Sequence, residues 1–228
     1  FLFPFMDEFP NYQHFDEALP PQYKRKIMAF YKSMLQRHMY ATGKKYYAAK
    51  APAFSAKIET LIEFFPDARI IYLARNPLDM LPSTVSWVNY SRGVFTGGFT
   101  KYQYLDEITD LTQHWYRYPL QYIDTHPSPR YLILNYDDLI QRPEQVIRGF
   151  YEQLGYPDKP GLDRIVDEAV KDTLAHRSDH TYSYEEMGFT SEKIVKMYAD
   201  IFERFGFDTR EEASSIKRSQ VVTVTSIE

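Results

Sequence analysis

Apolar side chains follow two patterns along the chain. Stripes in which apolar positions recur every three or four residues run through residues 21–40 and 58–65, and this spacing is typical of amphipathic helices. Compact apolar runs at residues 69–74 and 130–135 predict strands that are buried on both faces. Short strands that alternate with amphipathic helices indicate an α/β fold with a central parallel sheet flanked by helices.

Cap signals and weaker patterns predict the remaining elements. Pro143 and Gly155 bound one helix, and Thr190 and Gly206 bound another. The other predictions are a helix over 104–123, a weaker helix over 163–171, a strand over 44–51, a loop over 92–100 and an extended segment over 1–20. We assign residues 1–210 to one domain and residues 211–228 to a loosely attached tail.

Composition and charge exclude several classes of function. The net charge of −4 argues against nonspecific nucleic-acid binding, so any anion site has to be a local cluster. The absence of cysteine excludes disulfides and thiolate metal ligands and favours a reducing, cytoplasmic location. No metal is expected, and no apolar run approaches the roughly 20 residues that cross a bilayer.

The exit of the first predicted strand carries the candidate chemistry, because parallel sheets bind ligands beyond the carboxyl ends of their strands. Arg75 directly follows that strand, and Asn76 can cap the next helix. Ser83 shares a helical face with Asp79, and Pro82 predicts a bend or a 3₁₀ turn just before Ser83. A guanidinium fork, a hydroxyl and a helix N-terminus together suit an anion. Alternatively, Arg75 pairs with Asp79 and Ser83 is a solvated helix residue.

Residues 65–83, FPDARIIYLARNPLDMLPS, closely resemble the 3′-phosphate-binding segment of sulfotransferases that use 3′-phosphoadenosine 5′-phosphosulfate (PAPS). Weaker similarities follow the order of that family at KAP (50–52), LILNYDDL (132–139) with RP (142–143), and HTYSYEEMG (180–188), the last typical of bacterial-type members. The resemblance spans roughly residues 46–206. It implies the three-layer, P-loop-NTPase-like fold of the family.

The resemblance also implies roles for individual residues. Arg75 and Ser83 correspond to the pair that holds the 3′-phosphate of PAPS, the co-substrate. Tyr136 corresponds to a tyrosine beside the adenine in cytosolic members, although a core tyrosine is an equal alternative. Arg177 and His180 lie where a basic segment covers the nucleotide, although the basic-glycine pattern of that segment is missing here. The implied reaction moves a sulfonate group to a hydroxyl or amine of a small-molecule or glycan acceptor.

The chain departs from the family pattern in two places. The strand–loop–helix element that grips the 5′-phosphosulfate is not visible, and the opening FLFPFMDEFP lacks an initiator methionine and a signal pattern. We therefore expect that element in an upstream segment or on another chain. Pro52 occupies the position of the catalytic histidine of cytosolic members, so the catalytic residues are unassigned. His114, His176 and His180 could face the cleft, but each is read as an ordinary surface or core histidine.

Two other functions compete with the enzyme. A noncatalytic, degenerate sulfotransferase-like module for binding or assembly would explain the missing element, whereas the intact Arg75 and Ser83 pair argues against it. A kinase would need a phosphate loop and Mg²⁺-binding carboxylates, and neither is visible. The identity of the acceptor is not readable, because the aromatic residues downstream of the nucleotide segment suit a pocket or a core equally well: Trp87, Tyr90, Tyr102, Trp115 and Tyr116.

Overall fold

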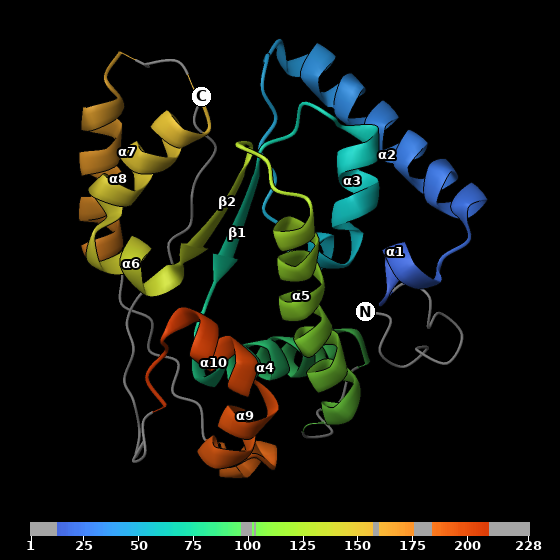
Figure 1. Ribbon diagram of the computed structural model, residues 1–228, viewed down its shortest axis with the longest axis vertical. Coiled ribbons are helices and arrows are strands. Elements are labelled where there is room, and N and C mark those ends of the chain that lie inside the picture. The colour runs from blue at the N-terminus through green and yellow to red at the C-terminus, as the bar shows by residue number, and fades with distance from the viewer. Residues whose placement is uncertain (1–12, 97–101, 103, 157–159, 176–183, 210–228) are drawn as a thin grey trace. The chain divides into compact units, whose positions relative to one another are not determined.

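The computed structural model in Figure 1 describes residues 13–96, 102, 104–156, 160–175 and 184–209. The chain divides into two compact units. The first unit comprises Phe1–Arg69 and Tyr104–Ser128, and the second comprises Ile70–Gln103 and Pro129–Glu228. The predicted boundary between a domain and a tail stays a prediction, because residues 210–228 lie outside the described part.

The described residues of the first unit form helices and connecting loops. Its elements are α1 (Phe15–Ala18), α2 (Pro21–Thr42), the 3₁₀ helix η3 (Pro52–Lys57), α3 (Ile58–Phe64) and α5 (Leu105–Thr125). The helices α2, α3 and α5 coincide with predicted helical segments. Gly43 ends α2 in the left-handed conformation, with a φ of 65° that costs glycine little.

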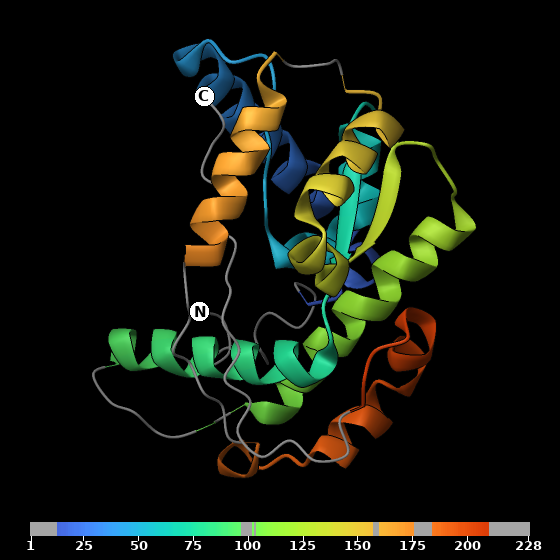
Figure 2. The same ribbon diagram turned by 90° about the vertical axis from the view of Figure 1, so that its left-hand side faces the viewer.

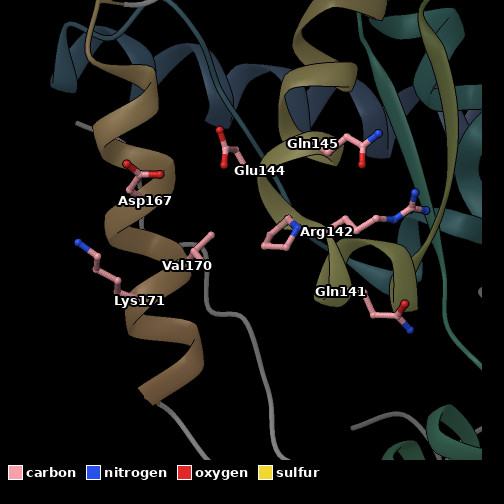
Figure 3. A pocket seen from close by; sticks show the side chains of 8 residues that line it. Gln141, Arg142, Glu144, Gln145, Asp167, Val170 and Lys171 are labelled. Carbon is pink, nitrogen blue, oxygen red and sulfur yellow. The ribbon is translucent and has the colours of Figure 1, made fainter.

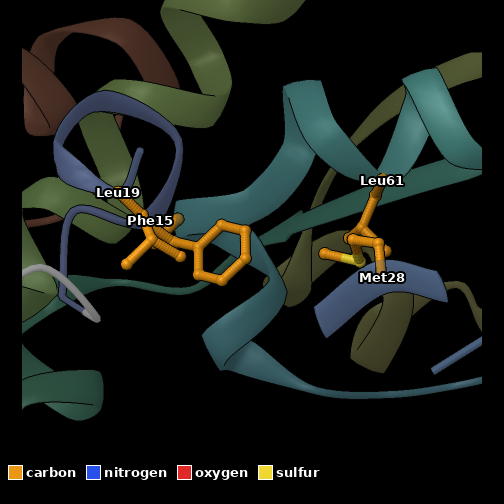
Figure 4. Packing of buried hydrophobic residues seen from close by; sticks show 5 residues of the cluster. Phe15, Leu19, Met28 and Leu61 are labelled. Carbon is orange, nitrogen blue, oxygen red and sulfur yellow. The ribbon is translucent and has the colours of Figure 1, made fainter. Parts of the chain in front are cut away.

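A small hydrophobic core holds α1 in the first unit. Its buried members are Phe15, Leu19, Met28, Ala56 and Leu61 (Figure 4). Burial of one large apolar side chain contributes about 1.5–3 kcal/mol. An isolated helix of four residues is not stable in water, so packing of Phe15 and Leu19 accounts for α1.

Asp16 ties α1 to the start of α3. Its buried carboxylate accepts hydrogen bonds from the backbone N–H groups of Glu59 at 2.9 Å and Thr60 at 3.3 Å. The hydroxyls of Thr60 and, at 3.1 Å, Tyr118 donate to it as well. Burial raises the pKa of Asp16, and these hydrogen bonds oppose the rise. A carboxylate at this position satisfies the N–H groups that the first turn of a helix leaves unpaired.

A two-stranded parallel sheet forms the centre of the second unit. The strands β1 (Ile70–Ala74) and β2 (Tyr131–Asn135) pair in a register that runs from Ile70 opposite Tyr131 to Ala74 opposite Asn135. Figures 1 and 2 show the two strands side by side, with their carboxyl ends at the same edge. Both strands were predicted, and the described chain is a mostly helical α/β fold with a parallel sheet.

Helices follow both strands of the second unit. They are α4 (Pro77–Thr96), α6 (Tyr136–Gln141), α7 (Pro143–Gln153), α8 (Leu162–Ala175), η4 (Glu185–Met187), α9 (Ser191–Met197) and α10 (Ala199–Phe205). The single helix predicted between Thr190 and Gly206 is divided at Tyr198 into α9 and α10. Its two ends are the predicted ones, since the Thr190 side chain accepts a hydrogen bond from the N–H of Lys193 and Gly206 is left-handed. No described helix combines the length and the apolar composition that crossing a membrane requires.

Several further predictions about local structure are wrong. The two strands are not buried on both faces, since Ile71 and Leu73 are 41% and 42% exposed. Only β1 and β2 are strands within the described residues, so each has a single pairing neighbour and less packing than a central strand. Residues 44–51 are a largely exposed coil, and no strand in the described part of the chain pairs with them. Residues 15–18 are helical rather than extended, and 92–96 continue α4 rather than form a loop.

Candidate functional site

The register of the sheet brings Arg75 and Tyr136 together. Ala74 and Asn135 are directly opposite each other at the ends of β1 and β2, so the next residue on each strand leaves the same edge of the sheet. The guanidinium carbon of Arg75 lies 5.2 Å from the centroid of the Tyr136 ring. This distance is within the range of a cation–π contact, which holds the guanidinium against the ring.

Asn76 determines how the chain turns from β1 into α4. Its side chain is buried, its Oδ1 accepts a 2.9 Å hydrogen bond from the N–H of Leu78, and its Nδ2 donates a 3.0 Å hydrogen bond to the carbonyl of Asp208. The first contact is the helix cap that was predicted. The second links the start of α4 to the segment after α10. The positive end of the helix dipole of α4 therefore begins two residues after Arg75.

Burial and the charged groups around Tyr136 change the pKa of its hydroxyl. Burial raises the pKa of the Tyr136 hydroxyl above its ordinary value of 10.0, Arg75 opposes this rise, and Asp137 and Asp79 add to it. Asp79 lies in the first turn of α4, where a carboxylate is favoured by the helix dipole. The hydroxyl of Tyr136 is consequently neutral at physiological pH.

Ser83 lies on α4, half-buried, one turn beyond Asp79. The structure continues as an α-helix through Pro82 without a 3₁₀ segment, so the 3₁₀ turn predicted before Ser83 is wrong, whereas the alternative, a bend, stays a prediction. The physical reason lies one turn earlier. Pro82 has no N–H to donate to the carbonyl of Leu78, and the Tyr184 hydroxyl donates a 3.0 Å hydrogen bond to that carbonyl instead.

This arrangement suits an anion with an attached aromatic group. A guanidinium presents a planar fork of donors to a phosphate, and the first turn of α4 adds a favourable dipole. An aromatic ring at the neighbouring strand exit can present its face or edge to a purine.

Most of the other residues singled out in the sequence fall into three groups. Arg177, His176 and His180 lie outside the described residues. Trp87 and Tyr90 on α4 are 59% and 64% exposed, which suits a surface available to a ligand. His114, Trp115 and Tyr116 belong to the first unit, where Tyr116 is buried.

A second cluster of polar residues was missed by sequence reasoning. His14, Glu17 and His114 come together in the first unit, with potential ligand atoms within 4.8 Å of one another. The three-residue spacing of His14 and Glu17 could have indicated that these two share a face of one helical turn. Nothing in the sequence placed His114 beside them.

An open depression lies between α7 and α8 (Figure 3). Its walls carry both signs of charge, from Arg142, Glu144, Asp167 and Lys171. Arg142 is already paired with Asp138 in an exposed ion pair. None of Arg75, Ser83 and Tyr136 lines this depression, so it does not correspond to the predicted nucleotide site.

Comparisons with known proteins place the chain in a family. Its sequence matches the model described as "Sulfotransferase family" over residues 4–160. Two curated relatives, from Mycobacterium bovis and Mycobacterium tuberculosis, are named omega-hydroxy-beta-dihydromenaquinone-9 sulfotransferase Stf3. Each is 24% identical over 211 residues, which cover 88% of this chain and 51% of the relative. The chain thus spans about half the length of the curated relatives it matches.

A solved structure shows the same fold. Sulfotransferase STF9 from Mycobacterium avium matches with a TM-score of 0.57 and 22% sequence identity, over 71% of this chain and 42% of that protein. The likeness agrees with the predicted P-loop-like fold. The match to the family model covers well over half of the sequence, and the chain belongs to the sulfotransferase family.

Proposed function

We propose that this chain supplies the 3′-phosphate-binding part of a sulfotransferase that moves a sulfonate group from PAPS to an acceptor. The observation that carries the proposal is the contact of the Arg75 guanidinium with the Tyr136 ring at two paired strand exits. The contact preorganises a cation beside an aromatic surface where α4 begins. A cation for the phosphate and an aromatic surface for the purine together suit a nucleotide that carries a phosphate close to its purine.

Each proposed role follows from the chemistry of the side chain. Arg75 offers two parallel N–H donors to the 3′-phosphate, and Ser83 offers one neutral hydroxyl donor. Tyr136 lies beside the adenine, and its raised pKa keeps the hydroxyl uncharged near the phosphate. Arg177 would cover the nucleotide from the segment that follows α8.

The reaction itself is an in-line displacement at sulfur. The acceptor oxygen or nitrogen forms a bond to the sulfur while the bond from sulfur to the 5′-phosphate oxygen breaks, and 3′-phosphoadenosine 5′-phosphate leaves. A base takes the proton of the acceptor. We expect the base and the group that holds the sulfonate end to lie on a further segment or on another chain.

The acceptor is proposed to be a small molecule or a glycan that presents a hydroxyl. The name of the Stf3 relatives specifies an omega-hydroxylated dihydromenaquinone, which supports a hydroxyl ahead of an amine. The exposed Trp87 and Tyr90 side chains of α4 suit the apolar or ring surface of such an acceptor.

A nucleotide titration tests the 3′-phosphate site directly. Calorimetric binding of 3′-phosphoadenosine 5′-phosphate is compared with that of 5′-AMP, and the former is expected to bind more tightly. Loss of a charged hydrogen bond costs about 1.5–3 kcal/mol, so Arg75→Ala should weaken the former roughly 10- to 100-fold and leave 5′-AMP nearly unchanged. Arg75→Lys, which keeps the charge and loses the fork, should lie between the two.

Arg164→Ala is the matched control, because Arg164 is an exposed arginine of the same unit, paired with Glu168 on α8. Equal affinities for the two nucleotides, or an Arg75→Ala variant that binds like wild type, would contradict the 3′-phosphate site. Transfer of labelled sulfonate by the complete protein then separates an enzyme from a noncatalytic module. A retained 3′-phosphate preference without transfer would favour the module.

A further inference from the structure

We propose that His14, Glu17 and His114 form a binding site for a zinc ion in the first unit. The site is independent of the proposed nucleotide function, because all three residues belong to the unit that does not contain Arg75. It would fasten α1, the shortest helix of that unit, to α5.

Two distances within the cluster, both from Glu17, are close to those around a tetrahedral ion, and all three potential ligand atoms lie within 4.8 Å of one another. Oε2 of Glu17 lies 3.3 Å from Nδ1 of His14 and 3.6 Å from Nδ1 of His114. Zinc binds nitrogen and oxygen ligands at about 2.0–2.1 Å, which places neighbouring ligand atoms of a tetrahedron about 3.3–3.4 Å apart. Only small side-chain adjustments would therefore bring the three atoms onto one ion.

The backbone holds the ligands in place before any ion binds. The carbonyl of His14 accepts hydrogen bonds from the N–H groups of Glu17 at 3.1 Å and Ala18 at 2.8 Å, so one helical turn positions His14 and Glu17 together. Tyr118, one turn after His114 on α5, stacks on the His114 ring at 5.0 Å with an interplanar angle of 20°. The Tyr118 hydroxyl is itself anchored to Asp16 of α1.

The carboxylate of Asp110 lies where it can orient one of the proposed ligands, His14. The Nε2 atom of His14, which faces away from Glu17, lies 3.5 Å from a carboxylate oxygen of Asp110 on α5. A carboxylate on the second ring nitrogen is the usual way to orient a metal-binding histidine and to make it more basic. Glu17 and Asp110 bring two carboxyl groups to the cluster, and acidic groups of this kind favour a bound cation.

His114 is a mostly buried histidine that turns its Nδ1 atom toward Glu17. Its side chain is nine-tenths buried. The His114 ring lies beside the ring of His14. The two rings are only 4.1 Å apart, a separation at which two protonated imidazoles would repel each other.

The donor set selects the class of metal. Two imidazoles and one carboxylate suit zinc and related first-row ions, whereas Mg²⁺ and Ca²⁺ prefer oxygen ligands alone. The carboxylate of Asp110 faces the far nitrogen of His14. The fourth position of the ion is therefore left to water.

The test is a titration of the untagged, chelator-treated chain with Zn²⁺ and separately with Mg²⁺. We expect one Zn²⁺ per chain and a higher unfolding temperature, because an ion that binds only the folded state stabilises it; Mg²⁺ should do neither. Glu17→Gln and His114→Gln each remove one ligand and should weaken Zn²⁺ binding more than roughly 10-fold. Asp110→Asn keeps all three ligands and should weaken it by roughly 10-fold.

The controls remove matched groups elsewhere. His126→Gln changes an exposed histidine of the same unit that stacks on Tyr122, and Arg75→Ala changes the nucleotide site. Both should keep the wild-type affinity for Zn²⁺. Absence of Zn²⁺ binding, or equal affinities of the wild type and Glu17→Gln, would overturn the proposal and leave an ion-paired cluster. Glu17 is 54% exposed, so its variant is expected to fold even if His114→Gln does not.

Discussion

The hydroxyl of Tyr184 donates a 3.0 Å hydrogen bond to the carbonyl oxygen of Leu78, the acceptor that Pro82 leaves without its helical donor. Leu78 and Pro82 are both almost completely buried, so water does not substitute for the missing N–H. The side chain of a residue more than 100 positions away thereby completes the hydrogen bonding of α4. This explains why α4 stays continuous up to Ser83 and beyond.

Removal of this hydroxyl tests the compensation. Tyr184→Phe leaves a buried carbonyl unsatisfied and should lower the free energy of unfolding by roughly 1–3 kcal/mol. Pro82→Ala restores a backbone donor to the Leu78 carbonyl. In that background the cost of Tyr184→Phe should be smaller by at least about 0.5 kcal/mol, measured by urea denaturation. Identical costs in the two backgrounds would show that Tyr184 does not replace the donor missing at Pro82.

Two asparagines at the carboxyl ends of the paired strands offer a matched comparison. Asn135 caps α6 through one 2.9 Å hydrogen bond from the N–H of Asp137 and is half-buried, so Asn135→Ala should cost about 1 kcal/mol. Asn76 is buried and also binds the carbonyl of Asp208. Asn76→Ala should therefore cost roughly 2–3 kcal/mol, with Asn76→Ser, which keeps only the cap, in between. Equal costs for the two alanine variants would argue against a structural role for the Asp208 contact.

Tyr136 is expected to act through its ring rather than its hydroxyl. Tyr136→Phe should bind 3′-phosphoadenosine 5′-phosphate within about 2-fold of wild type, whereas Tyr136→Leu loses the cation–π contact and should cost roughly 1–2 kcal/mol of binding. Burial raises the pKa of the hydroxyl above 10.0, so the hydroxyl stays largely protonated from about pH 7 to about pH 9.5. The affinity ratio of wild type to Tyr136→Phe should consequently stay constant from about pH 7 to about pH 9.5. A ratio that changes with pH would indicate ionisation of the hydroxyl.

Asp16 should stabilise the first unit through the helix that it caps. Asp16→Ala leaves the N–H groups of Glu59 and Thr60 without their acceptor and should cost roughly 2–4 kcal/mol. Asp16→Asn keeps one acceptor oxygen and should cost less. Amide hydrogen exchange at Glu59 and Thr60 provides the local readout. Asp67→Ala, an exposed carboxylate beyond the end of α3, is the control and should change stability by less than about 0.5 kcal/mol.

Local signals were sufficient for much of the fold. The spacing of apolar residues predicted α2, α3 and α5, and the cap residues Pro143, Thr190 and Gly206 marked helix ends correctly. These signals act within about one helical turn, so they can be read from neighbouring positions. The strand predicted over 44–51 failed because a strand also needs a partner, and no local pattern states whether one is present.

The candidate site likewise combines features that the sequence shows with a contact that only the structure shows. Arg75, Asn76 and Ser83 stand within nine positions of one another, and the sequence alone singled out their chemistry and the cap at Asn76. The contact of Arg75 with Tyr136 depends on the register of β1 and β2, two strands that are about 60 positions apart. Such pairings follow from the packing of the whole unit.

The amino-acid sequence was enough to predict the type of most elements, the family resemblance and the strand exit that carries Arg75, since each depends on neighbouring residues. Only the tertiary structure showed the Tyr184 hydroxyl at the Leu78 carbonyl, the Asp16 carboxylate at the start of α3, and His114 beside His14 and Glu17. Each of these contacts joins groups that are dozens of positions apart. Their meeting depends on which apolar faces pack together, and a one-dimensional pattern does not specify that.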